Sequence, residues 1–159
     1  MHGFNQGILE LKSLCNINNG DIIFLQEHWL NLDSLRHFDY FKNDYYIYGS
    51  SSMDAIIKHG ILSGRPHGGL CTLIRKSFGM KFNKIQCIAC TERYIIVALD
   101  KLLLINIYLP SCTRLTDLDS LCSIFNDITC AVEGLDVFYT IAGGDLNSNV
   151  LQTSQFSKC

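Results

Sequence analysis

The spacing of apolar residues indicates helices near both ends of the chain. Over residues 8–17, apolar side chains recur at steps of three and four, which predicts a short amphipathic helix. The same spacing over residues 116–135 predicts the longest helix, with Thr116 and Asp119 spaced as a capping pair. A further short helix is expected over residues 30–38. The buried face of the first helix should carry Ile8, Leu11, Leu14 and Cys15.

Other apolar runs are short, rich in β-branched and aromatic residues, and bounded by Gly, Asn, Asp or Pro, as is typical of strands. We expect strands over residues 22–25, 45–48, 70–74, 85–89, 94–99, 102–109 and 137–142. Lys101 occupies a tight turn, so the strands on either side of it should pair. Residues 53–64 have no clean period and are expected to form a loop. The order of elements predicts an α/β fold in which helices cover a mixed sheet.

One predicted strand ends in polar residues that suit a binding site. The apolar run over residues 137–142 reads as a buried strand, and Gly143 and Gly144 then allow a turn or a close approach to a ligand. Asp145 and Asn147 follow, and residues two apart in an extended backbone face the same way. A carboxylate and an amide in one cleft could bind a phosphate, a metal ion or a water molecule. An Asx turn after the strand explains the same residues equally well.

Four further positions are candidate site residues. Glu27 stands at the end of the first predicted strand, where α/β sheets place their ligands, although it could instead cap the following segment. Tyr108 lies at the mouth of a later strand, on the same face as Asn106, and half-buried packing is its alternative role. Arg65 could contact substrate, as could Asn106, but the start of a hairpin would account for Arg65 and the neighbouring His67.

Composition restricts the classes of protein to consider. With 159 residues, 48% of them apolar, and only two prolines, the chain can form one domain with a core. No apolar run is long enough to span a bilayer, and the start lacks the pattern of a signal peptide, so an intracellular location is the default expectation. The eight cysteines lie mostly in apolar runs and are expected to be buried free thiols. Cys87 and Cys90 have zinc-ligand spacing, but no second such pair follows.

Charge is unevenly distributed along the sequence. The formal net charge of −2 argues against a general nucleic-acid-binding protein. Residues 56–101, however, contain eight Lys or Arg against only two acidic residues, Glu92 and Asp100. A basic middle within an acidic frame is compatible with a surface that meets phosphates beside a cation-binding centre. A solvated basic face without such a role gives the same pattern.

Three motifs together resemble the endonuclease/exonuclease/phosphatase family. They are Asp-Ile-Ile-Phe-Leu-Gln-Glu-His-Trp-Leu at 21–30, Ile-Asn-Ile-Tyr-Leu-Pro at 105–110 and Gly-Gly-Asp-Leu-Asn at 143–147. The Gln-Glu-His-Trp-Leu form, with Gly-Arg-Pro-His-Gly-Gly at 64–69, most resembles the apurinic-type endonuclease domain of LINE-like non-LTR retrotransposons. The resemblance covers nearly the whole chain. It implies a single α/β (α+β) domain over residues 1–159, built as a four-layer sandwich of two mixed β-sheets flanked by helices.

The resemblance also implies roles for individual residues. Glu27 would be the Mg²⁺ ligand, with Mn²⁺ as a substitute ion, and Tyr108 would hydrogen-bond the scissile phosphate. Asp145 would align and activate the attacking water, and Asn147 would help to hold the phosphate oxygens. In-line attack on DNA would leave a 3′-hydroxyl, which primes reverse transcription in the retrotransposon setting. A reverse transcriptase domain would then follow downstream, and the protein would act in the nucleus without a membrane partner.

Two departures from the family pattern affect these expectations. The family's opening Asn, if Gly3 is the glycine that follows it, would fall before Met1, and Asn5 with Gly7 fits less well. The terminal Asp-His pair is also missing, since the five histidines all precede Asp145. We therefore expect an incomplete domain without its last strands, with an uncovered sheet edge and little or no activity alone. The alternatives are a non-catalytic remnant that binds nucleic acid, or a phosphoinositide phosphatase or sphingomyelinase-type phosphodiesterase.

Overall fold

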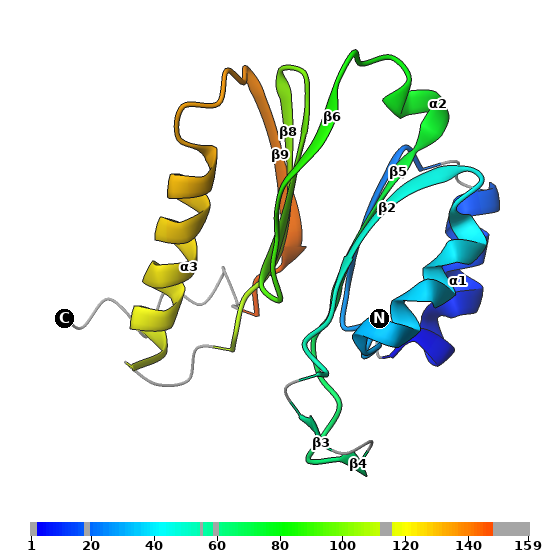
Figure 1. The fold of residues 1–159 in the computed structure, drawn as a ribbon, viewed down its shortest axis with the longest axis vertical. Helices are drawn as coiled ribbons and strands as arrows, with labels where there is room; N and C mark the ends of the chain where they lie inside the picture. The colour runs from blue at the N-terminus through cyan, green and yellow to red at the C-terminus, as the bar shows by residue number, and fades with distance from the viewer. Residues whose placement is uncertain (1–2, 18–19, 55, 59–60, 112–115, 148–159) are drawn as a thin grey trace.

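Two sheets lie face to face between outer layers of helix in the computed structural model, which describes residues 3–17, 20–54, 56–58, 61–111 and 116–147 (Figure 1). In chain order the elements are α1 (Phe4–Ile17), β1 (Ile22–Gln26), the 3-10 helix η1 (Leu32–Phe41), β2 (Tyr45–Ser50), β3 (Ile57–Lys58), β4 (Ile61–Leu62), β5 (Leu70–Arg75), α2 (Lys76–Gly79), β6 (Ile85–Cys90), β7 (Tyr94–Leu99), β8 (Leu102–Tyr108), α3 (Thr116–Val132) and β9 (Tyr139–Asp145).

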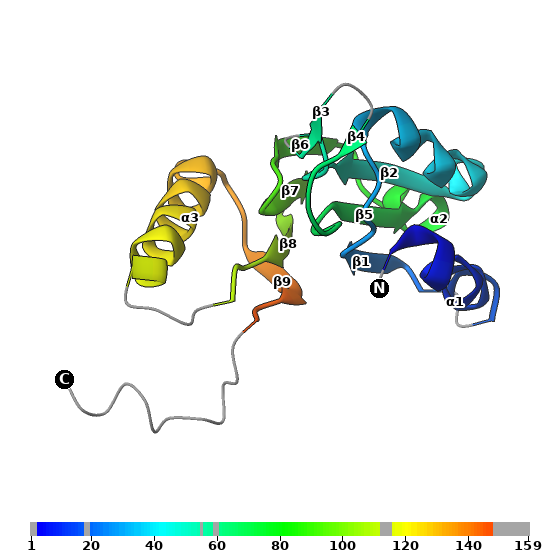
Figure 2. The same cartoon turned by 90° about the horizontal axis from the view of Figure 1, so that it is seen from below.

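The layers follow one another as α3, a four-stranded sheet, a three-stranded sheet, and α1 with η1 (Figure 2). The three-stranded sheet has the order β1-β5-β2 and is antiparallel. The four-stranded sheet has the order β6-β7-β8-β9 and is mixed, because β8 and β9 run parallel on either side of the α3 crossover. The predicted α/β fold of two sheets flanked by helices is confirmed, and so is the predicted pairing of β7 with β8.

Continuous apolar runs form the strands that are buried on both faces. In β5, Cys71 and Leu73 face α1 and η1, while Leu70 and Ile74 face the other sheet. In β8, Ile105 and Ile107 pack under α3. The core therefore consists of three apolar layers, one between the sheets and one beneath each outer layer of helix.

The helices depart from their predicted forms in detail. The first helix begins at Phe4 rather than at residue 8 and buries Leu11 and Cys15 as predicted, but Leu14 is 42% exposed. The helix expected over residues 30–38 is the 3-10 helix η1, which begins after Asn31, whose side chain accepts a hydrogen bond from Ser34 N. The predicted capping pair at Thr116 involves a side chain outside the described residues.

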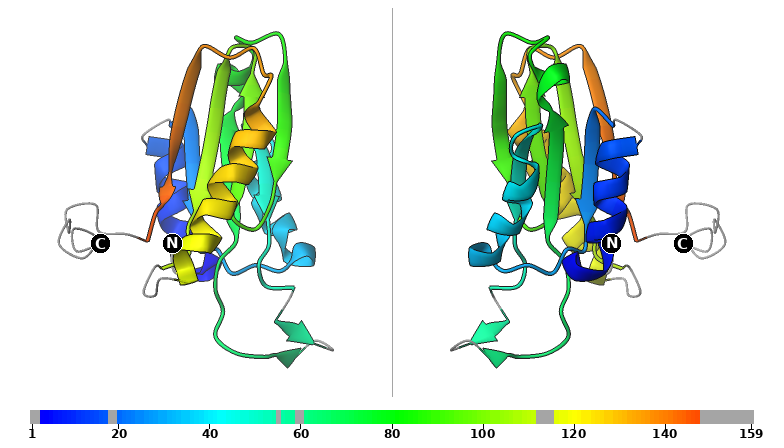
Figure 3. Two further views of the ribbon diagram at one scale, coloured as in Figure 1. Left: turned by 90° about the vertical axis from the view of Figure 1, so that its left-hand side faces the viewer. Right: turned by 90° about the vertical axis from the view of Figure 1, so that its right-hand side faces the viewer.

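The expected loop over residues 53–64 contains the short hairpin of β3 and β4, which projects beyond the two sheets (Figure 3). Two of its apolar side chains, Ile61 and Leu62, are 72% and 41% exposed. Two-residue strands carry too little periodicity to be recognised in a sequence.

The expectation of a buried last strand is wrong. β9 lies at the edge of the four-stranded sheet and pairs with β8 alone among the described strands (Figure 3). Tyr139 and Ile141 on this strand are 71% and 46% exposed, and Phe138 just before it is 73% exposed. An apolar run is compatible with burial, but the burial itself depends on neighbours that the run does not specify.

The cysteines also differ from expectation. Cys15 and Cys71 are buried, whereas the thiols at 87, 90, 122 and 130 are exposed, and all six are free. Cys112 and Cys159 lie outside the described residues. A separate finding is that no helix in the described part of the chain has the length and apolar character needed to cross a membrane.

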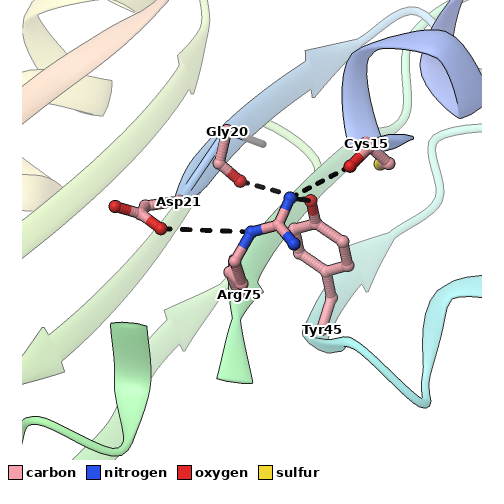
Figure 4. Close-up of polar contacts among 5 residues, drawn as sticks. All are labelled: Cys15, Gly20, Asp21, Tyr45 and Arg75. Atoms are coloured by element: carbon pink, nitrogen blue, oxygen red, sulfur yellow. Dashed lines mark hydrogen bonds and ion pairs between the residues drawn. The ribbon is translucent and has the colours of Figure 1, made fainter. Parts of the chain in front are cut away.

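Arg75, at the end of β5, ties together segments at the end of the three-stranded sheet opposite Glu27 (Figure 4). Its Nη2 donates to Cys15 O at 3.0 Å and to the Tyr45 hydroxyl at 2.5 Å. The Tyr45 hydroxyl in turn donates to Gly20 O at 3.2 Å, and Arg75 Nε lies 4.0 Å from Asp21 Oδ1. These contacts join the end of α1 to β2 and β5, which fixes this helix against the sheet.

Candidate active site

A cleft of 340 Å³ opens where the carboxyl ends of β1 and β9 meet. Glu27 directly follows β1, and Asp145 is the last residue of β9, so the two sheets each contribute one carboxylate to the same cleft. The residues that line it are Glu27, Trp29, Arg65, Pro66, His67, Asp145 and Asn147. The structure therefore brings together residues that lie more than a hundred positions apart in the sequence.

The backbone around Glu27 adopts an unusual conformation that neighbouring segments hold in place. Glu27 and Trp29 have φ angles of 64° and 58°, in the left-handed region that non-glycine residues rarely adopt. Glu27 N donates to Gly69 O at 2.9 Å, and Trp29 N donates to Gly68 O at 3.1 Å. On the other side, Gly3 N donates to Glu27 O at 2.9 Å. These three bonds fix the direction in which the Glu27 side chain leaves the strand.

His28 anchors this loop from inside the protein. Its side chain is fully buried; Nε2 lies 2.9 Å from Ser50 O and 3.3 Å from Leu70 O, and Leu30 N donates to Nδ1 at 3.0 Å. Because Nδ1 accepts, the ring proton is on Nε2 and the imidazole is neutral. Burial lowers the pKa of His28 and keeps it neutral. His28 is therefore a packed, hydrogen-bonded neighbour of the site.

The Glu27 carboxylate receives hydrogen bonds on both oxygens. The Tyr108 hydroxyl donates to Oε1, and Trp29 Nε1 donates to Oε2. Burial acts to raise the pKa of Glu27, but these bonds and a backbone bond from Gly68 outweigh it, so the pKa is lowered and the carboxylate is ionised at neutral pH. Burial and the Glu27 charge raise the pKa of Tyr108 to about 12, so this phenol remains a proton donor. The Arg93 guanidinium lies 5.6 Å from the centre of the Tyr108 ring.

The opposite rim of the cleft is an Asx turn at the end of β9. Asn147 N donates to Asp145 Oδ1 at 2.9 Å, and Asn147 Nδ2 donates to Leu109 O at 2.6 Å. The Asx turn is therefore present, and the same residues also line the cleft, so ligand binding by Asp145 and Asn147 stays a prediction. Gly144 is required here: a Cβ on it would lie 1.9 Å from Ile107 O.

Arg65 and His67 form the third side of the cleft. Both are exposed and follow the β3–β4 hairpin, and the His67 ring nitrogen Nδ1 lies 3.2 Å from Arg65 O. The sequence leaves both residues open between a contact to phosphate and the start of a hairpin, and it places every histidine upstream of Asp145 in the chain. The structure brings His67 to the same cleft as Asp145. The signal in the sequence was the Gly-Arg-Pro-His-Gly-Gly motif, whose glycines contact the Glu27 loop.

Asn106 does not contact the cleft, which corrects its assignment as a substrate-binding residue. Its side chain is fully buried between the sheets, where Oδ1 accepts from Gln26 Nε2 at 2.6 Å. Its Nδ2 donates to Cys71 O at 3.1 Å and to Thr72 Oγ1 at 3.2 Å. Asn106 does share a face with Tyr108, but only Tyr108, two residues closer to the strand end, reaches the Glu27 carboxylate.

The donor atoms of the cleft suit a hard divalent cation. Glu27 and Asp145 offer carboxylate oxygens, and Asn147 carries an amide oxygen. Within the described residues, no three His, Cys, Asp or Glu side chains are grouped closely enough to hold an ion alone. Mg²⁺ commonly uses one or two carboxylates and completes its shell with waters and substrate phosphate oxygens. The residues present therefore fit an ion that is shared with a phosphate substrate.

Comparison with protein-family models and with curated protein sequences gives no match. Solved structures do match. The 3′ phosphatase NExo from Neisseria, bound to a product DNA hairpin, has a TM-score of 0.63 and 16% identity over 92% of this chain and 55% of that one. An AP endonuclease from Archaeoglobus fulgidus has a TM-score of 0.62 and 13% identity over 92% and 54%. D. rerio TDP2, complexed with a single-strand DNA product, has a TM-score of 0.53 and 19% identity over 92% and 55%.

These neighbours are DNA-processing enzymes of the exonuclease/endonuclease/phosphatase fold. At such identities the likeness shows the fold alone, and this chain spans about half the length of the structures that it matches. The chain therefore has the α/β fold of these enzymes, and the candidate cleft lies at the strand ends of that fold.

Proposed function

We propose that the cleft hydrolyses a phosphodiester bond of DNA with the help of Mg²⁺ or Mn²⁺. The observation that carries the proposal is that Glu27, held by Tyr108, and Asp145, joined to Asn147, reach one cleft from two different sheets. Support also comes from the neighbours of the same fold, two of which were solved with a DNA product.

The polar residues at the cleft have separate parts in this proposal. Glu27, ionised and exposed to the cleft, would hold the cation, which supplies positive charge to a phosphate oxygen. Tyr108 keeps its proton at neutral pH. Its hydroxyl, which donates to Glu27 in this structure, would donate to the phosphate when substrate is bound. Arg65 would add positive charge at the cleft mouth, and Asn147 would hold a phosphate oxygen.

Asp145 is suited to orient the attacking water. Water oxygen would form a bond to phosphorus while Asp145 accepts its proton, and the bond from phosphorus to the 3′-oxygen would break in line with the attack. The departing oxygen would take up a proton, which leaves a 3′-hydroxyl and a 5′-phosphate. Donors from Tyr108 and Arg65 would stabilise the negative charge that grows on the phosphate oxygens in the transition state.

The biological setting is also part of the proposal. The Gln-Glu-His-Trp-Leu and Gly-Gly-Asp-Leu-Asn motifs favour an endonuclease of the retrotransposon type, whose nick primes a reverse transcriptase in the nucleus. We expect the rate of the 159-residue chain to be low, because the only histidine that lines the cleft among the described residues is His67, which is exposed on a loop.

Nicking of supercoiled plasmid DNA tests the proposal directly. We expect slow conversion to the open circle in Mg²⁺ or Mn²⁺ and none in EDTA. Glu27→Gln and Asp145→Asn should each lower the rate by roughly 10²- to 10³-fold, because each removes a charge that acts on the transition state. Asp136→Asn is the matched control, since Asp136 is an exposed carboxylate that pairs with Lys101 away from the cleft.

Two results would contradict the proposal. If Glu27→Gln nicks at the same rate as the unsubstituted chain, the activity does not come from the cleft. If neither ion supports nicking, the chain does not hydrolyse DNA. Salt-dependent DNA binding without nicking would instead favour the non-catalytic alternative, which draws on the basic residues 56–101. Cleavage of a phosphoinositide or sphingomyelin but not of DNA would change the substrate class.

A further inference from the structure

Two cysteines lie close together on the edge of the molecule opposite the cleft. Cys87 and Cys90 belong to β6, one edge strand of the four-stranded sheet, whereas β9 with Asp145 is the other edge (Figure 3). Both cysteines are exposed and free. The Cys90 thiol donates to Gly49 O at 3.5 Å, on the edge strand β2 of the other sheet. The dithiol pair, as we name these two cysteines, therefore lies at the exposed edge where β6 and β2 meet.

A β-bulge puts the two thiols on one face of β6. In a regular strand the side chains alternate, so residues three apart point to opposite faces. In β6 the register shifts between Cys87 and Ala89. As a result, the two cysteines lie opposite Val97 and Ile95, which are two residues apart on β7 and both face the core between the sheets. Ala89 packs on the other side, beneath α3, so the dithiol pair shares the face turned toward β2.

We propose that the dithiol pair binds one Cu(I) ion, a soft cation, through both sulfurs. Cys87 and Cys90 lie close enough to share a hydrogen bond between their thiols, and thiolates select soft ions. Binding breaks two S–H bonds and forms two Cu–S bonds, and the two protons pass to the solvent. No group is oxidised or reduced. The inference goes beyond the proposed hydrolysis, because this site shares no residue with the cleft.

Distances favour a bridging ion over a disulfide bond. A disulfide requires an S–S length of about 2.05 Å and Cα atoms no more than about 6.8 Å apart. Two successive positions on one face of a strand are already about 6.8 Å apart, and the pairing of β6 with β7 opposes a closer approach. A metal ion with M–S bonds of about 2.3 Å spans sulfurs up to about 4.6 Å apart. The spacing that would strain a disulfide therefore suits an ion.

The number of ligands favours Cu(I) over Zn²⁺. Structural zinc sites use four protein ligands, and no three His, Cys, Asp or Glu side chains are grouped for an ion in the described parts of the chain. Cu(I) has a filled d shell and forms stable complexes with two thiolates. The exposed thiols of α3 offer no such pair, because Cys122 and Cys130 are eight residues apart, roughly 12 Å along the helix axis.

Anaerobic titration of the reduced 159-residue chain with Cu(I) tests the inference. Cu(I) is supplied as its coloured complex with bathocuproine disulfonate, and the loss of that colour gives the affinity of the protein. Alkylation with iodoacetamide, followed by peptide mass spectrometry, shows which thiols the ion protects. We expect one Cu(I) per chain and joint protection of Cys87 and Cys90, while Cys122 and Cys130 are still alkylated.

Substitutions of single thiols locate the site. Cys87→Ser and Cys90→Ser should each weaken Cu(I) binding by roughly 100-fold or more, because loss of a group that merely supports a metal ligand already costs roughly 10- to 100-fold. Both positions are exposed, so neither change opens the core. The matched control combines Cys122→Ser with Cys130→Ser, which removes two exposed thiols from α3 and should keep the affinity.

A second control tests the role of the bulge. Ala89→Cys combined with Cys90→Ser keeps the number of cysteines in β6 but moves one of them to the face beneath α3. This variant should bind Cu(I) as weakly as Cys90→Ser alone. Affinity equal to that of the unsubstituted chain would show that a shared face is not required, which contradicts the proposed geometry.

Three further results would overturn the inference. Unchanged affinity in Cys87→Ser would exclude the dithiol pair as the ligand. Loss of binding in the control that lacks Cys122 and Cys130 would assign the ion to α3. A disulfide between Cys87 and Cys90 that forms in air, without Cu(I) uptake in the anaerobic titration, would make the pair a redox site instead. Cys87→Ser should leave plasmid nicking unchanged, so the proposed function is tested separately.

Discussion

The two rims of the cleft are built in contrasting ways. The Glu27 rim rests on fully buried His28 and on backbone bonds to Gly3, Gly68 and Gly69. The Asp145 rim ends an edge strand whose outer residues are exposed, and an Asx turn completes it. The first rim is part of the folded core, and the second is peripheral. Substitutions in the buried residues and glycines that support the first rim should therefore act mainly on stability, and those in the second rim mainly on activity.

The largest loss of stability should come from adding a side chain that clashes with the buried His28. Gly69 has φ of +89°, and a Cβ there would lie 2.4 Å from His28 Cε1. Gly69→Ala should therefore lower the free energy of unfolding by about 3 kcal/mol or more, through backbone strain and displacement of the buried ring. Urea denaturation measures this loss.

Gly64→Ala is the control for backbone strain alone. Gly64 has φ of +103°, but nothing lies within 4 Å of the Cβ position. We expect a loss of about 1 kcal/mol, which is the cost of the left-handed conformation without a clash. Equal losses at Gly64 and Gly69 would show that the His28 contact does not hold the first rim.

A loss of stability of intermediate size should appear when the pH is lowered. Burial lowers the pKa of His28 in the folded protein, while the unfolded chain keeps the ordinary value of 6.5. Below pH 6.5 the unfolded state therefore binds more protons, and stability is complete above this pH and falls as the pH decreases through it. The slope from one such group is at most about 1.4 kcal/mol per pH unit.

His28→Gln should remove this slope and lower stability at neutral pH by about 2 kcal/mol, because the bonds to Ser50 O and Leu70 O are disturbed. His67→Gln should keep the slope, since His67 is exposed on the loop at the cleft mouth. Urea titrations between pH 5 and about 7.5 compare the three proteins. A slope that persists in His28→Gln would assign the dependence to another group.

A smaller effect on stability, with a larger one on activity, is expected at the second rim. Asn147→Ala removes the bond from Nδ2 to Leu109 O on an exposed turn. The free energy of unfolding should fall by about 1 kcal/mol or less, while nicking falls roughly tenfold because the turn no longer holds its geometry. Thermal denaturation and plasmid nicking measure the two quantities. A stability loss as large as that of Gly69→Ala would remove the contrast between the rims.

The smallest effect on stability is expected at an exposed apolar position of the edge strand β9. Ile141→Thr replaces a 46% exposed side chain by another β-branched one, so stability should change by no more than about 0.5 kcal/mol. Self-association should decrease, because an exposed apolar edge strand favours contact between chains. Sedimentation velocity measures this decrease. Leu9→Ser is the control, since Leu9 is 74% exposed on α1, away from a sheet edge, and its change should leave self-association as it was.

The sequence was sufficient where local pattern determines structure. The apolar run over residues 70–74 predicted the strand β5, and the alternation in β8 placed Asn106 and Tyr108 on one face. It was insufficient where the outcome depends on what lies opposite. Alternation could not show that Asn106 faces another sheet, nor that the apolar run of β9 has no covering neighbour among the described strands.

The candidate site shows the same division. The ends of strands identified Glu27, Tyr108 and Asp145, because polar residues after buried runs are visible in the sequence. Trp29 and His67 were not identified as parts of one cleft. Their positions depend on the left-handed backbone at residues 27 and 29 and on the path of the β4–β5 loop, both of which are set by long-range hydrogen bonds to Gly68 and Gly69.

The parallel pairing of β8 with β9 has a consequence for biosynthesis. Residues 3–75 contain the whole three-stranded sheet and every backbone contact of the Glu27 loop, so this half can assemble early as the chain leaves the ribosome. Asp145 joins it only after the α3 crossover has been translated and β9 has docked beside β8. A nascent chain would thus fold the loop that carries Glu27 before Tyr108 and Asp145 arrive to complete the cleft.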